Sequence, residues 1–431
     1  MKNTMLIFLI LTAAGLAPAY GKGSSCVECH LSGSWVSDTT FAASYITNDI
    51  HYKMGLGCPD CHGGDSKLGF AEGDPDLAMD PAKGYKAPPD RLDIPEFCGR
   101  CHSDIEYMKR FNPKLPTDQL TLYKTSIHGK MLSENKDTKV AICTDCHGVH
   151  DIMPSSDSRS GIYHNNVPET CRKCHGSPLY MKGYKYGGRQ IGTSQYEDYA
   201  KSIHGILVLE KGDNSAPACN NCHGNHGATP PNLASVSAAC GECHANNRDL
   251  FNASPHKEAF KELGYPECEQ CHSNHYIKPV SDEMIGVGDG ALCIGCHDKD
   301  SGGYQAAAEM KAAIDSLKSA LNKAETTVRE AEEKGVEGGQ ARFDLGAAKD
   351  DLTRVRSVIH SFDPAQVSEI TRSGVKISNE VEKTAQAALG DIKIRQIGLA
   401  VSLVLVLLVA VVLWRKIKQA DSRTDFTVND K

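Results

Sequence analysis

Cys143-Thr144-Asp145-Cys146-His147 is one of nine copies of the motif Cys-x-x-Cys-His in this chain of 431 residues. In such a motif, two thiols can bond the vinyl groups of one haem, and the adjacent histidine is then held beneath the iron as an axial ligand. Histidine follows every cysteine pair and no cysteine is left over, which disfavours the alternative of a zinc or disulfide framework. We therefore predict nine covalently bound haem c groups, each with its iron.

The motifs and the remaining histidines define the predicted haem-binding residues. The covalent attachment residues are Cys26, Cys29, Cys58, Cys61, Cys98, Cys101, Cys143, Cys146, Cys171, Cys174, Cys219, Cys222, Cys240, Cys243, Cys268, Cys271, Cys293 and Cys296. The proximal iron ligands are His30, His62, His102, His147, His175, His223, His244, His272 and His297. Nine histidines lie outside the motifs, enough for one distal ligand per iron: His51, His128, His150, His164, His204, His226, His256, His275 and His360.

The composition departs from that of an ordinary globular protein of this length. Only 6% of the residues are aromatic and two are tryptophan, so porphyrin must supply much of the apolar core between the first and last motifs. We expect a mainly α-helical and irregular fold, a multihaem domain that does not form without haem. The formal net charge of −7 and the lack of a basic block argue against nucleic acid as a partner.

An internal repeat organises residues 126–300. Ser126-Ile127-His128 begins one copy, and its histidine precedes Cys143 by the fifteen residues that also separate His204 from Cys219. In a third copy, Ser254-Pro255-His256 stands closer to its motif, and in each copy a second motif follows, at Cys171, Cys240 and Cys293. The repeat predicts three dihaem modules. Residues 20–125 form a preceding region with three haem motifs.

Each of these modules also carries a histidine three residues after the motif histidine, at His150, His226 and His275. Residues so close along the chain cannot reach opposite faces of one porphyrin, so we predict that these histidines bind neighbouring haems; the alternative is that they are surface residues. His164 has no counterpart in the other modules. The N-terminal region has only His51 outside its motifs, so its haems must receive ligands from other modules.

After His297 the sequence changes to a helical pattern, predicted as an antiparallel bundle or stalk over residues 304–390. Apolar residues alternate spacings of three and four along three segments, which indicates packed helices rather than a disordered linker. The segments are separated by a glycine-rich break at residues 335–339 and by Asp363-Pro364. At about 1.5 Å per residue the first helix runs out roughly 45 Å and the second returns roughly 35 Å. His360 is thereby predicted to lie near the last haems, against the alternative of a solvated helix histidine.

Both ends of the chain carry membrane-related segments. Residues 1–19 resemble a signal peptide, with Lys2, an apolar run and a small-x-small cleavage site at Ala17-Pro18-Ala19. Residues 397–414 are eighteen uncharged, apolar residues, sufficient for a transmembrane helix rather than a buried core helix. Basic residues in 415–431 predict a cytoplasmic tail, with the haem domain in the periplasm or outside.

Short segments of this sequence resemble those of a known group of proteins. Ser-Ile-His-Gly at Ser126 and Cys-Thr-Asp-Cys-His-Gly-Val-His-Asp-Ile at Cys143 are similar to the multihaem c-type cytochromes of anaerobic respiration, the broad group of hydroxylamine oxidoreductase-like and cytochrome c3-like proteins. Residues 338–362 resemble the helical tail that some of these carry, in which the position of His360 resembles a haem ligand. The resemblance covers most of residues 26–390 and implies respiratory electron transfer by bis-histidine haems.

Two functions follow from these observations. In the first, six-coordinate haems conduct electrons between redox partner proteins, which are membrane quinol-oxidising or periplasmic cytochromes, while the C-terminal helix anchors the chain in the cytoplasmic membrane. In the second, one five-coordinate haem reduces or oxidises a small nitrogen or sulfur compound. The histidine count favours conduction. The sequence has no Cys-x-x-Cys-Lys motif, which argues against an ammonia-forming nitrite reductase of the usual kind.

Overall fold

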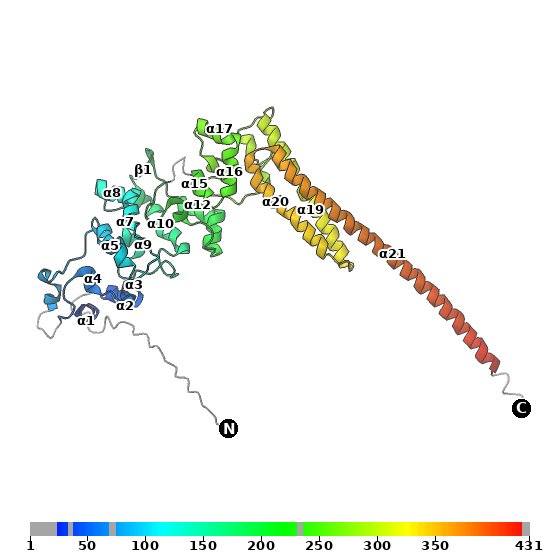
Figure 1. The fold of residues 1–431 in the computed structure, drawn as a ribbon, viewed down its shortest axis with the longest axis horizontal. Helices are drawn as coiled ribbons and strands as arrows, with labels where there is room; N and C mark the ends of the chain where they lie inside the picture. The colour runs from blue at the N-terminus through cyan, green and yellow to red at the C-terminus, as the bar shows by residue number, and fades with distance from the viewer. Residues whose placement is uncertain (1–23, 33–37, 69–74, 231–235, 425–431) are drawn as a thin grey trace, which may run out of the picture. The chain divides into compact units, whose positions relative to one another are not determined.

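The computed structural model describes residues 24–32, 38–68, 75–230 and 236–424 (Figure 1). The chain divides into two compact units, one formed by residues up to 235 together with 272–279, the other by residues 236–271 and 280 onward. The predicted signal peptide at 1–19 and the end of the predicted tail, 425–431, lie outside the described residues.

The first unit consists of short helices and turns joined by irregular chain, with one antiparallel pair of two-residue strands, β1 (Lys185–Tyr186) and β2 (Arg189–Gln190). Its helices and helical turns are α1 (Ser25–Ser32), α2 (Thr40–Asn48), α3 (Ile50–Lys53), α4 (Cys58–His62), η2 (Pro75–Met79), η3 (Pro81–Lys83), α5 (Ile94–His102), α6 (Ile105–Met108), α7 (Gln119–Thr125), α8 (Ile127–Asn135), α9 (Cys143–His147), η4 (His164–Asn166), α10 (Val167–His175), α11 (Pro178–Met181), α12 (Gln195–Lys201), α13 (Ile203–Gly205), η5 (Ile206–Glu210) and α14 (Cys219–His223).

The second unit combines a short-helix region with three long helices. The short elements are α15 (Val236–Gly241), α16 (Ala245–Ala253), α17 (Pro255–Leu263), α18 (Glu267–His272), η6 (Asp282–Met284) and η7 (Cys293–Gly295). The long helices are α19 (Gly302–Glu333), α20 (Gly339–Val358) and α21 (Pro364–Thr424), with the turn η8 (Ile359–Ser361) between the last two.

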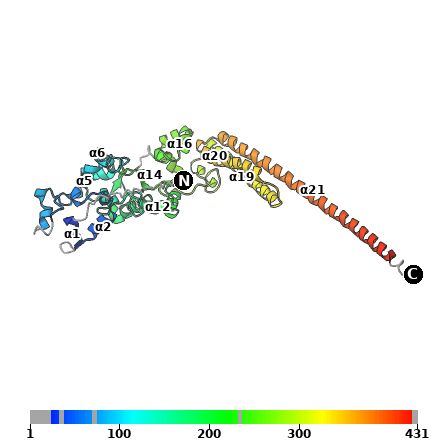
Figure 2. The same cartoon turned by 60° about the horizontal axis from the view of Figure 1, so that its bottom comes forward.

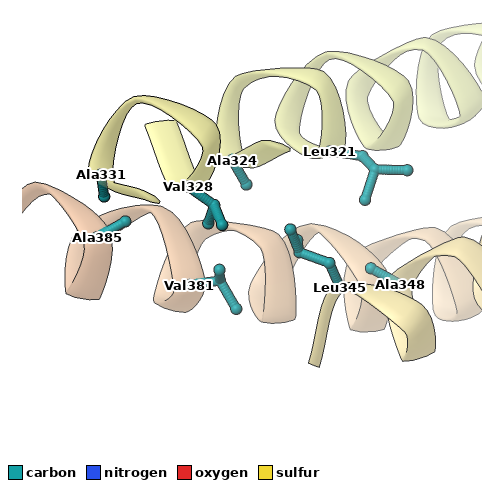
Figure 3. Close-up of a cluster of buried hydrophobic side chains, with 8 residues drawn as sticks. All are labelled: Leu321, Ala324, Val328, Ala331, Leu345, Ala348, Val381 and Ala385. Atoms are coloured by element: carbon teal, nitrogen blue, oxygen red, sulfur yellow. The ribbon is translucent and has the colours of Figure 1, made fainter. Parts of the chain in front are cut away.

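Helices α19, α20 and α21 pack along one another (Figure 1 and Figure 2). Their apolar seams meet in a cluster of eight buried side chains, shown in Figure 3: Leu321, Ala324, Val328, Ala331, Leu345, Ala348, Val381 and Ala385. A second cluster lies nearer the start of α19: Met310, Ile314, Val355, Val367 and Ile370. All seven apolar residues of the seam predicted for the first helix are buried.

Glycine permits one close approach between these helices. A Cβ atom added to Gly374 of α21 would lie 2.7 Å from a methyl carbon of Leu317, which is fully buried on α19. A larger residue would therefore force the two helices apart, because packed side chains leave no room for an extra methyl group.

The C-terminal part of α21 has the opposite character. Residues 364–420 include an 18-residue window of mean hydropathy 3.0, none of which is buried within the structure. Such a long apolar helix fits a single-pass membrane anchor. This apolar segment continues without a break from the part of α21 that packs on α19 and α20. One continuous helix therefore contains both the packed segment and the apolar segment.

Candidate haem sites

Three haem motifs begin a helix at their first cysteine, in α4, α9 and α14. In each of these motifs the residue before the second cysteine turns back and accepts the backbone N–H of the residue that precedes the helix, in the pairs Asp60–Gly57, Asp145–Ile142 and Asn221–Ala218. Such a bond satisfies a backbone donor that a helix start leaves free. The next glycine, Gly63, Gly148 or Gly224, has positive φ and ends the helix directly after the motif histidine.

The cysteines of successive motifs lie beside one another. Their first cysteines lie close enough for the two thiols to interact in four pairs: Cys26–Cys58, Cys98–Cys143, Cys171–Cys219 and Cys240–Cys268. Other cysteines approach closely enough to interact electrostatically in the pairs Cys61–Cys101, Cys146–Cys171 and Cys271–Cys293. Within the first unit these contacts link motifs one to six in sequence order, and within the second unit they link the cysteines of motifs seven to nine.

Six motif histidines face a histidine from outside the motifs. Their ring centres lie 5.9 to 6.3 Å apart in the pairs His51–His102, His62–His150, His128–His175, His147–His226, His223–His275 and His256–His297. A metal–imidazole bond of about 2 Å on each side, with the distance from each nitrogen to its ring centre, gives about 6 Å between two rings that share one metal ion. These pairs therefore fit a haem iron held between two imidazoles.

Burial keeps most of these rings neutral, which is the form that binds metal. It lowers the pKa of His147 to about 4, with a further contribution from the nearby His226. Burial also lowers the pKa values of other histidines in the pairs: His102, His128, His150, His175, His226, His256 and His275. Neutral rings can offer a nitrogen lone pair without first losing a proton.

A backbone contact recurs at three of the histidines outside the motifs, His51, His128 and His204. The isoleucine before each of these histidines donates its N–H to a carbonyl that lies two residues after the extra histidine of the following repeat. The three bonds are Ile50 to Ile152 at 2.8 Å, Ile127 to Ala228 at 3.1 Å and Ile203 to Ile277 at 2.9 Å. The residues before these isoleucines, Asp49, Ser126 and Ser202, are almost fully buried. We call these three bonds the repeat junctions.

A tyrosine contact marks the same repeat. The hydroxyl of a tyrosine five or six residues before the distal histidine donates to a carbonyl two residues before the next motif, in the pairs Tyr45–Leu56, Tyr123–Ala141 and Tyr199–Pro217. The segment from Tyr45 to His102 thus carries the same two contacts as the copies that begin at Ser126 and Ser202. Sequence reasoning missed this copy because Asp49 replaces serine and because His51 lies only seven residues before Cys58.

The copy at Ser254-Pro255-His256 lacks both contacts. Phe251 stands where the other copies have tyrosine and has no hydroxyl, and Pro255 has no backbone N–H to donate. The serine still bonds its local backbone as in the other copies, since the Ser254 hydroxyl donates to the carbonyl of Phe251 at 2.7 Å. This copy therefore keeps the local serine hydrogen bond of the other copies but cannot make a repeat junction.

The turn between α20 and α21 contacts the haem motifs of the second unit. Phe362, with a φ of 54°, places its ring 3.9 Å from that of His256. His360 is mostly buried, its Nδ1 lies 2.9 Å from the carbonyl oxygen of Ser357, and it is close enough to His244 for their charges to interact. The predicted position of His360 near late haem motifs agrees with these contacts.

A buried carboxylate also joins this region to the long helices. Asp282, which lies between the last two motifs and is 7% exposed, accepts two bonds of 2.9 Å from Arg356 of α20 and lies 2.8 Å from the ammonium of Lys318 on α19. The hydrogen bonds from Arg356 lower the pKa of Asp282 to about 2. One carboxylate thus binds both helices to the haem-motif segment.

His164 and His30 stand outside the pattern of facing rings. The Nε2 atom of His164 lies 2.8 Å from the carbonyl oxygen of Ala216. The ring that neighbours His30 is that of Phe41, 5.3 Å away in an edge-on arrangement. Neither arrangement could be foreseen from the sequence, in which both residues look like any other ligand candidate.

Residues 50–176 match the family model of cytochrome c3. The match supports a multihaem c-type cytochrome. It covers four of the nine motifs, at Cys58, Cys98, Cys143 and Cys171, and it implies covalently bound haem c with iron and a role in electron transfer. Neither the curated proteins nor the solved structures include one that matches the chain.

Proposed function

We propose that the protein is a membrane-anchored nonahaem cytochrome that conducts electrons in anaerobic respiration. The observation that carries this proposal is the order of the cysteine contacts, which bring successive haem motifs together along each unit. Each haem supplies an iron that accepts or releases one electron. Neighbouring attachment points keep the haems close, so an electron can move from site to site without a diffusing carrier.

The facing histidines support distal ligands for six of the proposed haems. The distal histidine that begins a repeat faces the second motif of the same module, as His128 faces His175, whereas the extra histidine faces the first motif of the preceding module, as His226 faces His147. His204 and His360 then remain as distal ligands for the motifs that contain His244 and His272. Ligands donated between modules would make the haem sites of one unit fold together.

The anchor and the tail set the proposed location. The apolar helix at residues 397–414 holds the chain in the cytoplasmic membrane, with the tail in the cytoplasm and the haems in the periplasm or outside. From that place the haems would accept electrons from a membrane quinol-oxidising or periplasmic cytochrome and pass them to an acceptor. The basic residues at 415, 416 and 418 support this orientation.

Protein-film voltammetry tests conduction through the whole array. The purified full-length protein, tethered to an electrode through a tag after Lys431, is expected to exchange nine electrons. The double variant C143A/C146A removes one central haem, so at fast scan rates only the five haems from Cys171 onward should respond. C26A/C29A, which removes the first haem, serves as the matched control and should leave eight. Rapid exchange with eight haems in C143A/C146A would contradict a linear path.

The second candidate function, chemistry at one open iron, is favoured by a single observation. The ring of His30 lies edge-on to that of Phe41, with the ring centres 5.3 Å apart. This arrangement concerns one site of nine and is compatible with conduction along the others.

A further inference from the structure

We propose that the haem held by Cys26, Cys29 and His30 has an open coordination position, which binds a small neutral diatomic ligand. This inference rests on the proposed haem at that motif, but it does not require electron conduction along the array. It makes the first site chemically different from the others.

The available histidines are used elsewhere. Six of the nine outside the motifs face a motif histidine other than His30, at ring distances of 5.9 to 6.3 Å. His360 lies in the second unit beside His244, and His204 begins a repeat as His128 does. Only His164 is left for His30 by this count.

His164 is held by a different partner. Its Nε2 atom, one of the two nitrogens that could bind a metal, lies 2.8 Å from the carbonyl oxygen of Ala216. The next residue, Asn165, fixes the same turn by donating from its side-chain amide to the carbonyl of Val208 at 2.7 Å. Both bonds hold η4 against the segment around residues 208–216. His164 therefore has a structural role that accounts for its burial without a haem.

One ring beside His30 is not a possible iron ligand. Phe41 of α2 has its ring centre 5.3 Å from that of His30 and 5.2 Å from that of His150. His150 itself faces His62 at 6.3 Å. Phe41 thus neighbours both histidines, and His150 is already committed to the second motif.

The surroundings of His30 favour a neutral ligand over an anion. The polarity and hydrogen-bond donors beside a haem decide which ligand it binds, and Phe41 offers only an apolar ring. The nearby hydroxyl of Tyr45 is already donated to the carbonyl of Leu56 at 2.7 Å. Carbon monoxide or nitric oxide on ferrous iron needs no hydrogen-bond donor, so an apolar ring such as that of Phe41 does not oppose its binding.

Electrons can reach this position from the rest of the array. The thiol of Cys26 lies close enough to interact with that of Cys58, the first cysteine of the second motif. The first two haems would therefore be attached side by side. Cys26, Cys29 and His30 would thus hold a ferrous, ligand-binding iron beside the group held at Cys58, Cys61 and His62, which would supply its electron.

The test begins with the unmodified holoprotein. Mass spectrometry should find nine covalent haems, and electron paramagnetic resonance and carbon monoxide titration should find one high-spin, ligand-binding haem among them. A missing haem at Cys26 would defeat the haem assignment on which the proposed function rests. Nine haems that are all low-spin, without carbon monoxide binding, would overturn the open site alone.

A substitution that supplies the missing ligand gives the sharpest result. F41H places an imidazole beside His30 and is expected to convert the high-spin haem to low spin and to abolish carbon monoxide binding. F97H is the matched control, because Phe97 lies 6.3 Å from His62, which His150 already faces; the single high-spin haem should persist. Carbon monoxide binding that is unchanged in F41H, despite full haem loading, would count against an open position beside Phe41.

A second pair of variants separates the role of His164 from that of a ligand. H164A should leave the number of high-spin haems at one, whereas H226A, which removes the ring facing His147, should raise it to two. A second high-spin haem in H164A would show that His164 binds iron and would overturn the histidine assignment. This readout is spectroscopic, so a loss of activity or stability does not obscure it.

Discussion

The two parts of the chain bury apolar surface in different ways. Helices α19 to α21 share clusters of eight and five buried aliphatic or small side chains, whereas the largest such cluster in the described part of the first unit contains only Leu132, Val140 and Ile142. In the first unit the space between short helices is lined by cysteines and imidazoles. The difference teaches that buried side chains alone can form the core between the long helices. In the first unit, covalently bound haem must supply most of the buried apolar surface.

The sharpest test of this difference is to withhold haem. Protein produced without haem attachment should lose the structure of the first unit, because that unit has too few buried side chains to offset the entropy of an ordered chain. Helices α19 and α20 should keep theirs. Hydrogen exchange with mass spectrometry would show full exchange across residues 40–230 and protection near Ile314. Equal protection of both parts would contradict the comparison.

The converse test removes a side chain from the long helices. Leu317→Ala deletes a fully buried side chain that packs on Gly374, and we expect it to lower the free energy of unfolding of this region by about 3 kcal/mol. The haem spectra should not change. Phe343→Ala, at a residue of α20 that is 78% exposed, is the control and should cost less than about 0.5 kcal/mol. Thermal unfolding followed by circular dichroism and by haem absorbance separates the two effects.

Replacing Asp282 tests the ion pairs that join the haem-motif segment of the second unit to helices α19 and α20. Asp282→Asn removes a buried charge that binds Arg356 and Lys318, so we expect the second unit to lose about 2 kcal/mol of stability at neutral pH. Asp315→Asn, at a half-exposed ion pair with Lys311 on the same helix, should lose less than about 0.5 kcal/mol. Chemical unfolding of the two variants at pH 7 measures both.

The pH dependence of this contribution has a definite sign. The pKa of Asp282 is about 2 in the folded protein, below the usual value of about 3.9 in an unfolded chain. The stabilisation is therefore complete above about pH 5 and is lost as the pH falls toward 2. Asp282→Asn should remove this part of the acid sensitivity of the second unit, and an unchanged slope of stability against pH would argue against the carboxylate as its source.

The smallest expected effect concerns a repeat junction. Ile127→Pro removes the N–H that donates to the carbonyl of Ala228, and proline is tolerated at the first position of a helix such as α8. We expect a loss of about 1 kcal/mol from one hydrogen bond, with the haem count unchanged. Ile127→Ala keeps the N–H and controls for the lost side chain. Equal stability of the two variants would mean that the junction bond contributes nothing.

Local sequence patterns predicted much of this architecture. The Cys-x-x-Cys-His spacing predicts the attachment sites, because that chemistry requires neighbouring residues. The three-and-four spacing from Met310 to Ala331 predicted a helix whose seam residues are all buried. The position of His360 near the late motifs followed from helix lengths alone.

Other features depend on contacts between distant residues, which spacing does not encode. The sequence could not show that His150 faces His62 rather than another ring, or that the segment around His51 is a further copy of the dihaem repeat. Local spacing also could not predict the partner of His164, since its contact with the carbonyl oxygen of Ala216 joins residues 52 positions apart. A histidine count treats every imidazole as equivalent, whereas the fold places six of them opposite different motif histidines.

Pro255 ends the series of repeat junctions, because it has no N–H to donate. The bonds from Ile50, Ile127 and Ile203 are identical links, each joining one repeat to the next in a fixed direction. At the leading end, Gly63 and Gly64 follow the motif histidine, so that repeat has no extra histidine to give backward. In the copy at Ser254-Pro255-His256, proline has no N–H, so this copy cannot donate the same bond to a repeat that follows it. The repeats are therefore joined in one direction along the chain. Single residues in the first and last copies determine where this series of bonds begins and ends.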